Sequence, residues 1–480
     1  MIKGHLKKGI LTTVALSIIT LLCQILSVAY LARNLKPEDF GLIAILVSYF
    51  TIISIFTEFS FGSNIIQRKN ASQDFISAGI YVVMVLSIIV FIINLLIFKL
   101  ISEIIDVNSF EVYFFSSFLI VLLPLSNIVD ALALNKLDFK KSFIASVLSN
   151  VVGVLIVPIY LCYQGYGIYS LLIGTLLAPI IRILVLFKLL TSHLNLSPNF
   201  KEFYSGLRFS IYFTLAKFLS MLSLQGDRLV LGIKINNHAV GVYSRAQYFS
   251  QAIINLLTVA VERVGFPILS KNSDHEEKKI IFYEMISFIA MVTLSASVAL
   301  IYMSDTLVSL MLGKGWGEVI PIAQVLALLV FFRSLDKMAA IYMRSDYHIK
   351  ERFYFQLILS LSILGSIYLF SAYGLLYVAY FIVLLNFVAS IYTQFRLSKI
   401  LNNSILKHLK VYSGAVLSAL IFILCLIFLS SFNSQNNQIY KILILIFSYI
   451  PVLILIVLKP NIFFRENISK LILKITHRKF

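Results

Sequence analysis

Long apolar segments separated by short polar connectors run through the whole chain. Each apolar window is bounded by charged residues or by clusters of Gly, Pro or Asn, and is long enough for the roughly 20 residues that one bilayer crossing takes. The pattern predicts an all-α, polytopic membrane protein of about 14 transmembrane helices. The expected spans are 10–32, 40–62, 76–98, 111–133, 143–163, 168–187, 209–232, 241–266, 282–303, 318–342, 353–371, 374–395, 411–430 and 439–458.

The composition agrees with this pattern. Of the 480 residues, 60% are hydrophobic and only 13% are charged, and the mean hydropathy is +0.94. These values lie outside the range of ordinary soluble domains, and the short connectors leave little room for one. The net charge of +18 is therefore better explained by membrane orientation than by nucleic acid, and no nucleic-acid partner is expected.

The basic residues fall mainly on one side of the predicted spans. If the amino terminus is cytoplasmic, 27 Lys and Arg lie in cytoplasmic connectors and tails, 6 lie on the opposite side and 7 lie inside spans. By the positive-inside rule we expect both termini in the cytoplasm, which also requires an even number of spans. The run from Ile10 to Ala32 is too long for the apolar part of a signal peptide and is expected to be a retained first span.

Six predicted spans precede a long polar connector and six follow it before the last two. Phe40-Gly41 matches Val240-Gly241, and Tyr166-Gly167-Ile168 resembles Tyr373-Gly374-Leu375. Because six is even, the halves would be related by a pseudo-twofold axis along the membrane normal, as in transporters with alternating access. The expected parts are a six-helix lobe (1–190), a cytoplasmic connector (191–208), a second six-helix lobe (209–395), helices 13 and 14 (396–460) and a basic amphipathic cytoplasmic tail (461–480).

The usual motifs of enzymes and metal sites do not occur in the sequence. Cys23, Cys162 and Cys425 lie more than a hundred residues apart, and no two histidines have the i, i+4 spacing of a helical zinc site. There is also no phosphate-binding glycine loop, dinucleotide-binding turn or nucleophile elbow. We therefore expect no metal, no cofactor and no enzymatic activity.

Several short motifs resemble one family. The matching stretches are Arg33–Gly41, Glu58–Gly62 with Ile66–Arg68, Asp227–Gly232, Gly241–Ala246 and Val264–Ser270. They resemble the polysaccharide and O-antigen (Wzx-type) flippases of the multidrug/oligosaccharidyl-lipid/polysaccharide exporter (MOP) superfamily, although Ser60 stands where the family pattern has a first glycine. The motifs cover residues 33 to 270 densely, and beyond about residue 320 only the hydropathy agrees.

The resemblance implies a two-lobed bundle of twelve helices plus two in the bacterial cytoplasmic membrane. Its implied function is transport of undecaprenyl-diphosphate-linked oligosaccharide from the cytoplasmic to the outer leaflet. The implied partners are that lipid-linked substrate, membrane lipids and, as an open alternative, glycan-assembly proteins of the same pathway.

Charged residues inside predicted spans are the candidates for this chemistry. Each is costly when it faces lipid, by about 2.5–3.5 kcal/mol or more at a helix centre, so most are expected to face the interior or a partner. The basic ones are Arg182, Lys217, Arg228, Arg245, Arg263, Arg333 and Lys337, and the acidic ones are Glu58, Asp130, Asp227, Glu262 and Asp336.

Four of the basic residues are candidate substrate contacts. Lys217 is the most central and is the first candidate for binding the anion. Arg333 and Lys337 share one helix face at i and i+4, with Asp336 close by; an internal salt bridge with snorkelling is the alternative. Arg245 lies near the outer edge, where substrate release and snorkelling remain equally open.

The remaining charges have other expected roles. Glu58 and Asp130, together with Asp336, are candidates for ion coupling or gating, because no ATP motif supplies a driving force. The adjacent pairs Asp227-Arg228 and Glu262-Arg263 are expected to make structural ion pairs with neighbouring helices. Arg182, near a cytoplasmic end, is expected to mark topology.

Three alternatives to a flippase remain open at this point. An ion-coupled multidrug or organic-cation exporter of the same superfamily would need a more acidic interior than seven basic against five acidic residues. A membrane-embedded glycan polymerase usually needs a large outer loop, whereas the outer connectors here are short. A purely structural scaffold would leave the repeat and the charges inside the spans without an explanation.

Overall fold

The computed structural model describes residues 2–67, 72–105, 107, 109–135, 138–192, 200–271, 275–345, 349–431 and 438–458. Over these ranges every regular element is helical and no strand occurs. Contacts divide the chain into two compact units. Unit 1 comprises Met1–Ser244, Met311–Gly315 and Gln356–Tyr373, and unit 2 comprises Arg245–Leu310, Trp316–Phe355 and Gly374–Phe480.

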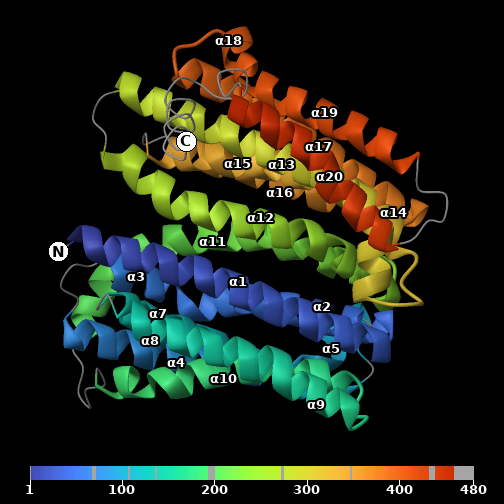
Figure 1. The fold of residues 1–480 in the computed structure, drawn as a ribbon. Coiled ribbons are helices and arrows are strands. Elements are labelled where there is room, and N and C mark those ends of the chain that lie inside the picture. Colours follow the sequence, from blue (N-terminus) through green and yellow to red (C-terminus); the bar gives the residue numbers. More distant parts are fainter. Residues whose placement is uncertain are drawn as a thin grey trace. The chain divides into compact units, whose positions relative to one another are not determined.

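The first half of the chain supplies the helices coloured from blue to green in Figure 1. They are α1 (Ile2–Asn34), α2 (Pro37–Glu58), α3 (Phe61–Gln67), α4 (Gln73–Leu96), α5 (Phe98–Ile105), α6 (Phe110–Ser117), α7 (Leu119–Asn135), α8 (Phe139–Leu148), the π-helix η1 (Ser149–Ile156), α9 (Val157–Tyr163), α10 (Ile168–Thr191) and α11 (Phe200–Lys234).

The second half continues with α12 (Asn237–Lys271), α13 (His275–Met311), α14 (Val319–Leu326), α15 (Leu328–Ser345), α16 (Ile349–Phe370), η2 (Ser371–Tyr373), α17 (Leu375–Ile400), α18 (Ile405–Leu409), η3 (Lys410–Tyr412), α19 (Ser413–Ser430) and α20 (Gln438–Leu458). The tail predicted over 461–480 lies outside the described residues.

A helix lies at every predicted span, which confirms the all-α membrane fold. Ten helical stretches of the described residues are long and apolar enough to cross a membrane. Two shorter apolar stretches, Ile18–Asn34 and Tyr440–Ile454, coincide with the first and last predicted spans, and α11 and α12 cover the seventh and eighth. The count of 14 crossings is therefore not confirmed.

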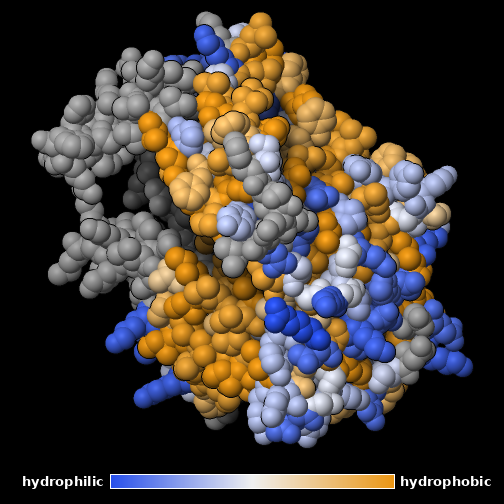
Figure 2. All heavy atoms as spheres, turned by 45° about the vertical axis from the view of Figure 1, so that its right-hand side comes forward, coloured by the Kyte–Doolittle hydropathy of each residue, from blue (hydrophilic) through white to orange (hydrophobic). Residues whose placement is uncertain are grey.

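The surface is suited to a lipid environment. Large apolar side chains are exposed in both units, among them Leu96 (79% exposed) on α4 and Leu424 (66% exposed) on α19. Figure 2 shows apolar side chains over much of the visible face, with hydrophilic residues gathered on one side. Such an extent of apolar surface is unusual for a soluble protein and is what contact with acyl chains requires.

A short π-helix, η1, interrupts the α-helical pattern and packs closely against α10. Pro158 has no backbone N–H, and the helix before it relaxes into the π-helix η1. Gly153 of η1 lies so close to α10 that a Cβ there would be 2.8 Å from the Ala178 nitrogen. Ser149 also donates a hydrogen bond of 2.7 Å to the Ala178 carbonyl. These contacts fix the segment of α10 that carries Arg182.

Equivalent residues of the two sequence repeats meet where α2 and α12 begin. A Cβ on Gly41 or on Gly241 would lie 1.7 Å or 1.9 Å, respectively, from a backbone oxygen of the other helix, so only glycine permits this approach. Beside them, Glu38 Oε1 and His238 Nδ1 are 2.9 Å apart. Both pairs are 200 residues apart in sequence, the offset that Phe40-Gly41 and Val240-Gly241 predict.

Candidate functional site

Unit 1 contains a cavity of about 420 Å³ among α2, α3, α7 and α11, in which charged side chains stand among apolar ones. We call it the unit 1 cavity. Its charged lining residues are Glu58, Asp130 and Lys217, all of which the sequence predicts as functional. The other lining residues are Thr51, Ser54, Ile55, Gly62, Ser63, Ile66, Leu123, Asn127, Ala131, Leu134 and Met221.

Glu58 is placed by an abrupt end of α2. The predicted span runs to residue 62, but the helix ends at Glu58 because Phe59 and Ser60 take left-handed backbone conformations, with φ of 47° and 50°. These conformations are unfavourable for residues other than glycine. The next helix approaches closely, since a Cβ at Gly62 would lie 3.3 Å from Glu58 Oε1. Backbone strain is thus concentrated beside a cavity carboxylate, as at many functional sites.

Glu58 and Lys217 form an ion pair across the cavity wall. Lys217 Nζ lies 2.8 Å from Glu58 Oε2, and Asn127 Nδ2 donates to the same oxygen at 2.9 Å. The Glu58 side chain is only 4% exposed, whereas the Lys217 side chain is 27% exposed. A buried carboxylate needs a partner of this kind, and the ammonium donors of Lys217 that Glu58 does not use stay available.

Asp130 and Arg182 make a second pair, between α7 and α10. Arg182 Nη1 donates to Asp130 Oδ2 at 2.8 Å. Asp130 Oδ1 and Arg182 Nε are buried and have no hydrogen-bond partner among the described residues. The pair is therefore held by one hydrogen bond instead of the two that a guanidinium and a carboxylate can form.

Lys217 belongs to a helix, α11, that makes further polar contacts. Along α11, Gln225 accepts hydrogen bonds from Ser48 of α2 (2.9 Å) and from Arg228 (3.0 Å). Asp227 accepts one from Tyr243 of α12 at 3.1 Å. The structural role predicted for Asp227 and Arg228 stays a prediction.

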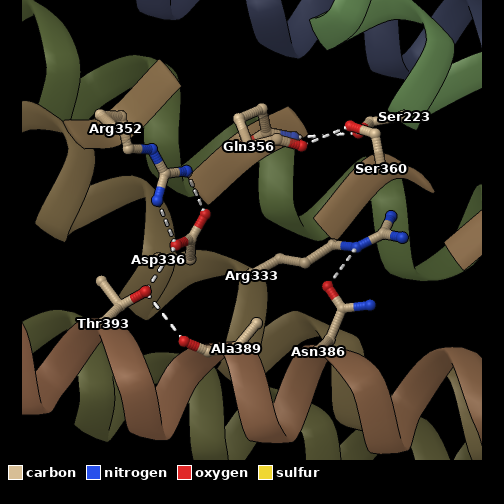
Figure 3. Close-up of polar contacts among 9 residues, drawn as sticks. All are labelled: Ser223, Arg333, Asp336, Arg352, Gln356, Ser360, Asn386, Ala389 and Thr393. Carbon is tan, nitrogen blue, oxygen red and sulfur yellow. Dashed lines mark hydrogen bonds and ion pairs between the residues drawn. The ribbon is translucent and has the colours of Figure 1, made fainter. Parts of the chain in front are cut away.

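A hydroxyl and amide cluster ties α11 to α16 within unit 1. The hydroxyls of Ser223 and Ser360 are hydrogen-bonded, and Gln356 Nε2 donates to Ser223 Oγ at 2.9 Å (Figure 3). Ser360 also donates to the Gln356 carbonyl at 2.6 Å. These bonds hold α11 to α16 at Ser223.

In unit 2, Asp336 is held by Arg352 and Thr393, and we call these three residues the Asp336 cluster. Arg352 binds the carboxylate through both terminal nitrogens, at 2.6 and 2.5 Å, and Thr393 donates to Asp336 Oδ1 at 3.3 Å (Figure 3). The bidentate geometry is the strongest arrangement available to this pair. The alternative predicted from the sequence was a salt bridge of Asp336 with Arg333 or Lys337 of its own span, whereas the bridge in the structure is to Arg352 on α16.

Arg333 points away from Asp336 in Figure 3. Its Nε donates to Asn386 Oδ1 at 3.3 Å, and its terminal nitrogens have no further hydrogen bond to the described part of the chain. Lys337, about one helical turn beyond Arg333 at i+4, is partly buried on α15. Arg333 thus presents free donors inside a predicted span.

The other predicted residues are less well defined. The Arg245 guanidinium lies 5.6 Å from the centre of the Tyr248 ring. The side chains of Glu262 and Arg263 lie outside the described residues. No group of three His, Cys, Asp or Glu placed to hold a metal occurs in the part of the chain that the structure describes.

Sequence reasoning missed three partners. It predicts Arg182 as a topology marker and Arg352 as part of a cytoplasmic connector, and it does not single out Asn127. The structure shows each bonded to a predicted acid. The usable signal was the acid itself, because a carboxylate inside a span requires a cation or donor on a neighbouring helix.

The sequence is similar to known proteins of polysaccharide biosynthesis. A family model described as "Polysaccharide biosynthesis protein" matches residues 30–321. The lipopolysaccharide biosynthesis protein WzxC of Escherichia coli (strain K12) is 24% identical over 319 residues, which cover 64% of this chain and 63% of WzxC. The chain thus spans just under two thirds of the length of this curated relative.

Solved structures show the same fold at low sequence identity. Lipid II flippase MurJ, in an inward closed conformation, has a TM-score of 0.70 at 18% identity, covering 91% of this chain and 97% of that chain. An inward-facing multidrug resistance MATE family transporter of the MOP superfamily has a TM-score of 0.66 at 16% identity, covering 82% and 99%. The family model covers more than half of the sequence, and the chain belongs to the polysaccharide biosynthesis protein family.

Proposed function

We propose that the chain is a flippase, a transporter rather than an enzyme. It moves undecaprenyl-diphosphate-linked oligosaccharide repeat units from the cytoplasmic to the outer leaflet by alternating access, for O-antigen, capsule or exopolysaccharide biosynthesis. The observation that carries the proposal is the cavity of unit 1, which is lined by the ionisable residues Glu58, Asp130 and Lys217 and lies among apolar helices. A lipid-linked diphosphate needs such a path, because bare charge in hydrocarbon costs on the order of tens of kcal/mol.

The family and the relatives support this role. The name of WzxC concerns lipopolysaccharide biosynthesis, and MurJ is described as a lipid II flippase. The location that fits is the bacterial inner membrane with both termini cytoplasmic, supported by the excess of Lys and Arg in the connectors that would face the cytoplasm. The lobe boundaries at 190, 208, 395 and 460 remain part of the proposal.

The residues divide into three proposed roles. Lys217 and Arg333 contact substrate phosphate, since both have donors left over from their bonds to Glu58 and Asn386. Lys337 and Arg245 are proposed as further substrate contacts. Glu58 and Asp130 couple transport to an ion, whereas Asp336, with both oxygens bonded to Arg352, holds α15 to α16, and its coupling or gating role stays a prediction.

Two assays test the function. Deleting the gene in the native host is expected to abolish surface glycan, and the wild-type gene to restore it. Purified protein in proteoliposomes is expected to expose undecaprenyl-diphosphate-linked glycan to an external glycosidase. Lys217→Ala is expected to fail in both assays, whereas Lys234→Ala on the same helix, whose ammonium lies over the Tyr368 ring, is expected to work. Full activity of Lys217→Ala would overturn the residue assignment, and undisturbed glycan display after deletion would overturn the function.

An ion-coupled multidrug exporter is the second candidate, favoured by the fold shared with the MATE transporter. It predicts extrusion of organic cations by the same proteoliposomes. Strong extrusion without glycan exposure would reverse the ranking.

A further inference from the structure

The ionisable side chains that line the unit 1 cavity are two acids and one base, and Arg182, which is bonded to one of the acids, brings their total charge to zero. Of the elements that surround it, α2 contributes Glu58, α7 contributes Asp130 and α11 contributes Lys217. Arg182 of α10 is bonded to Asp130, and α3 lines the cavity only with the uncharged residues Gly62, Ser63 and Ile66. Two carboxylates and two cations cancel when all are ionised. A neutral cavity of this kind does not by itself attract a dianion.

Both cations nevertheless have donors to spare. Among the described residues Lys217 Nζ bonds only Glu58, although an ammonium has three donors. Arg182 uses Nη1 alone, and its Nε is buried without a partner. Asp130 Oδ1 is likewise buried without a partner, so this pair is under-bonded on both sides. Each cation can therefore change partners by breaking one hydrogen bond, which costs less free energy than breaking the two bonds of a bidentate pair.

An arriving phosphate would compete with the carboxylates for these donors. A carboxylate that loses its cation inside a cavity wall is left as an uncompensated buried charge, and it is stabilised by taking up a proton. Glu58 is prepared for either state, because the Asn127 amide that now donates to Glu58 Oε2 also has an oxygen that can accept from a protonated Glu58. Protonation of both acids leaves two positive charges, from Lys217 in the cavity lining and from Arg182 beside Asp130.

We propose that the unit 1 cavity is a charge-switched site for a diphosphate diester, in which phosphate takes Lys217 and Arg182 while Glu58 and Asp130 each take up one proton. This inference rests on the proposed function and names how its headgroup is recognised. A diphosphate linked to lipid on one side and sugar on the other carries two negative charges, which match the two cations left after proton uptake. The volume of about 420 Å³ is more than enough for the diphosphate group.

Calorimetry on the full chain in nanodiscs tests the proton count. The probe is a short-chain isoprenyl-diphosphate-linked N-acetylglucosamine, whose two charges do not titrate near neutral pH. Titrations in two buffers of different ionisation enthalpy should give an uptake of about two protons per bound probe. The affinity should rise by up to about a hundredfold per unit fall in pH, because each proton contributes up to about tenfold.

Conservative variants separate switching from folding. Glu58→Gln with Asp130→Asn should bind the probe with no proton uptake and no pH dependence over the same range. Lys217→Met with Arg182→Met should lose binding at least tenfold. Asp138→Asn, which removes an acid capping α8, should leave the proton count unchanged.

The outcomes distinguish the charge switch from the flippase function. Tight probe binding without proton uptake by the wild type would overturn the charge switch while leaving the flippase function standing. Absence of probe binding by the wild type would overturn the site. Absence of glycan transport in proteoliposomes by a protein that does bind the probe with proton uptake would overturn the proposed function alone.

Discussion

The acid–base pairs of unit 1 and the Asp336 cluster of unit 2 use the same chemistry to different extents. In unit 1 each pair is joined by one hydrogen bond at 2.8 Å, and three of the four charged residues line a cavity. In unit 2, Arg352 occupies both oxygens of Asp336, and Thr393 adds a third bond. Charge inside a span therefore does not identify a site. A pair whose charged groups keep unused hydrogen-bond donors or acceptors can exchange partners. A pair whose groups are fully hydrogen-bonded holds helices together.

The largest expected effect comes from breaking the Glu58–Lys217 pair. Lys217→Met alone leaves a buried carboxylate without its cation, which should lower the free energy of unfolding by about 3–5 kcal/mol and abolish glycan transport. Adding Glu58→Gln removes the stranded charge, so the double variant should recover most of the stability but no transport. Denaturation in detergent and glycan exposure in proteoliposomes measure the two quantities. Recovery of transport by the double variant would make this pair structural, like Asp336 and Arg352.

The same test on the Asp336 cluster should give the opposite result for transport. Arg352→Met is expected to lower the free energy of unfolding by about 3–5 kcal/mol, because Asp336 loses its bidentate partner. Arg352→Met with Asp336→Leu should regain most of that stability, since apolar replacement of a buried ion pair is often neutral. Transport should return with it. A stable double variant that fails to transport would assign Asp336 a direct part in the cycle.

Much of this comparison could be predicted from the sequence. Hydropathy placed a helix at every expected span, and the charged positions Glu58, Asp130 and Lys217 proved to line one cavity. The repeat predicted from the sequence includes Gly167 and Gly374. Each of these glycines directly precedes a helix and has a positive φ, 54° for Gly167 and 101° for Gly374. These features depend on local pattern, which one sequence displays.

The pairing of charges could not be predicted in the same way. Arg182 meets Asp130 across 52 residues and Glu58 meets Lys217 across 159, and which helix faces lie together is set by packing. The pairing of Arg352 was missed for another reason, because a basic residue at the start of a span usually marks membrane topology. The early end of α2 could not be predicted either, because the left-handed residues there are Phe59 and Ser60 and not glycine, the residue that usually signals such a turn.

That turn gives a smaller test of the comparison, since strain is confined to the Glu58 side. Ser60→Gly removes a left-handed non-glycine residue, which costs about 1–2 kcal/mol, and it gives up the 3.3 Å contact with the Thr214 hydroxyl. We expect a net gain of about 1 kcal/mol in unfolding free energy together with slower transport, because Glu58 is held less firmly.

The matched control is Asn402→Gly in unit 2, where φ is 49° on an exposed residue. Asparagine tolerates this conformation better than serine, so stability and transport should both stay near wild type. Faster transport by Ser60→Gly would contradict a role for the strained turn in holding Glu58.

The smallest effect is expected at an acid that lies outside both regions. Asp138 caps α8: its Oδ1 accepts from the Lys141 backbone N–H at 3.1 Å and its Oδ2 lies 2.8 Å from Lys141 Nζ. The hydrogen bond with Lys141 holds the pKa of Asp138 below its ordinary value. A lowered pKa means that the ionised carboxylate stabilises the fold above its unfolded-state pKa and that this contribution is lost as the pH falls through the lowered value.

Asp138→Asn keeps a good cap but loses the ion pair, so it should lower stability by about 0.2–0.5 kcal/mol at neutral pH. The difference from wild type, measured by thermal unfolding from neutral to acid pH, should shrink to nothing once Asp138 is protonated. A difference that persists in acid would mean that the carboxylate acts through its shape as a cap and not through its charge.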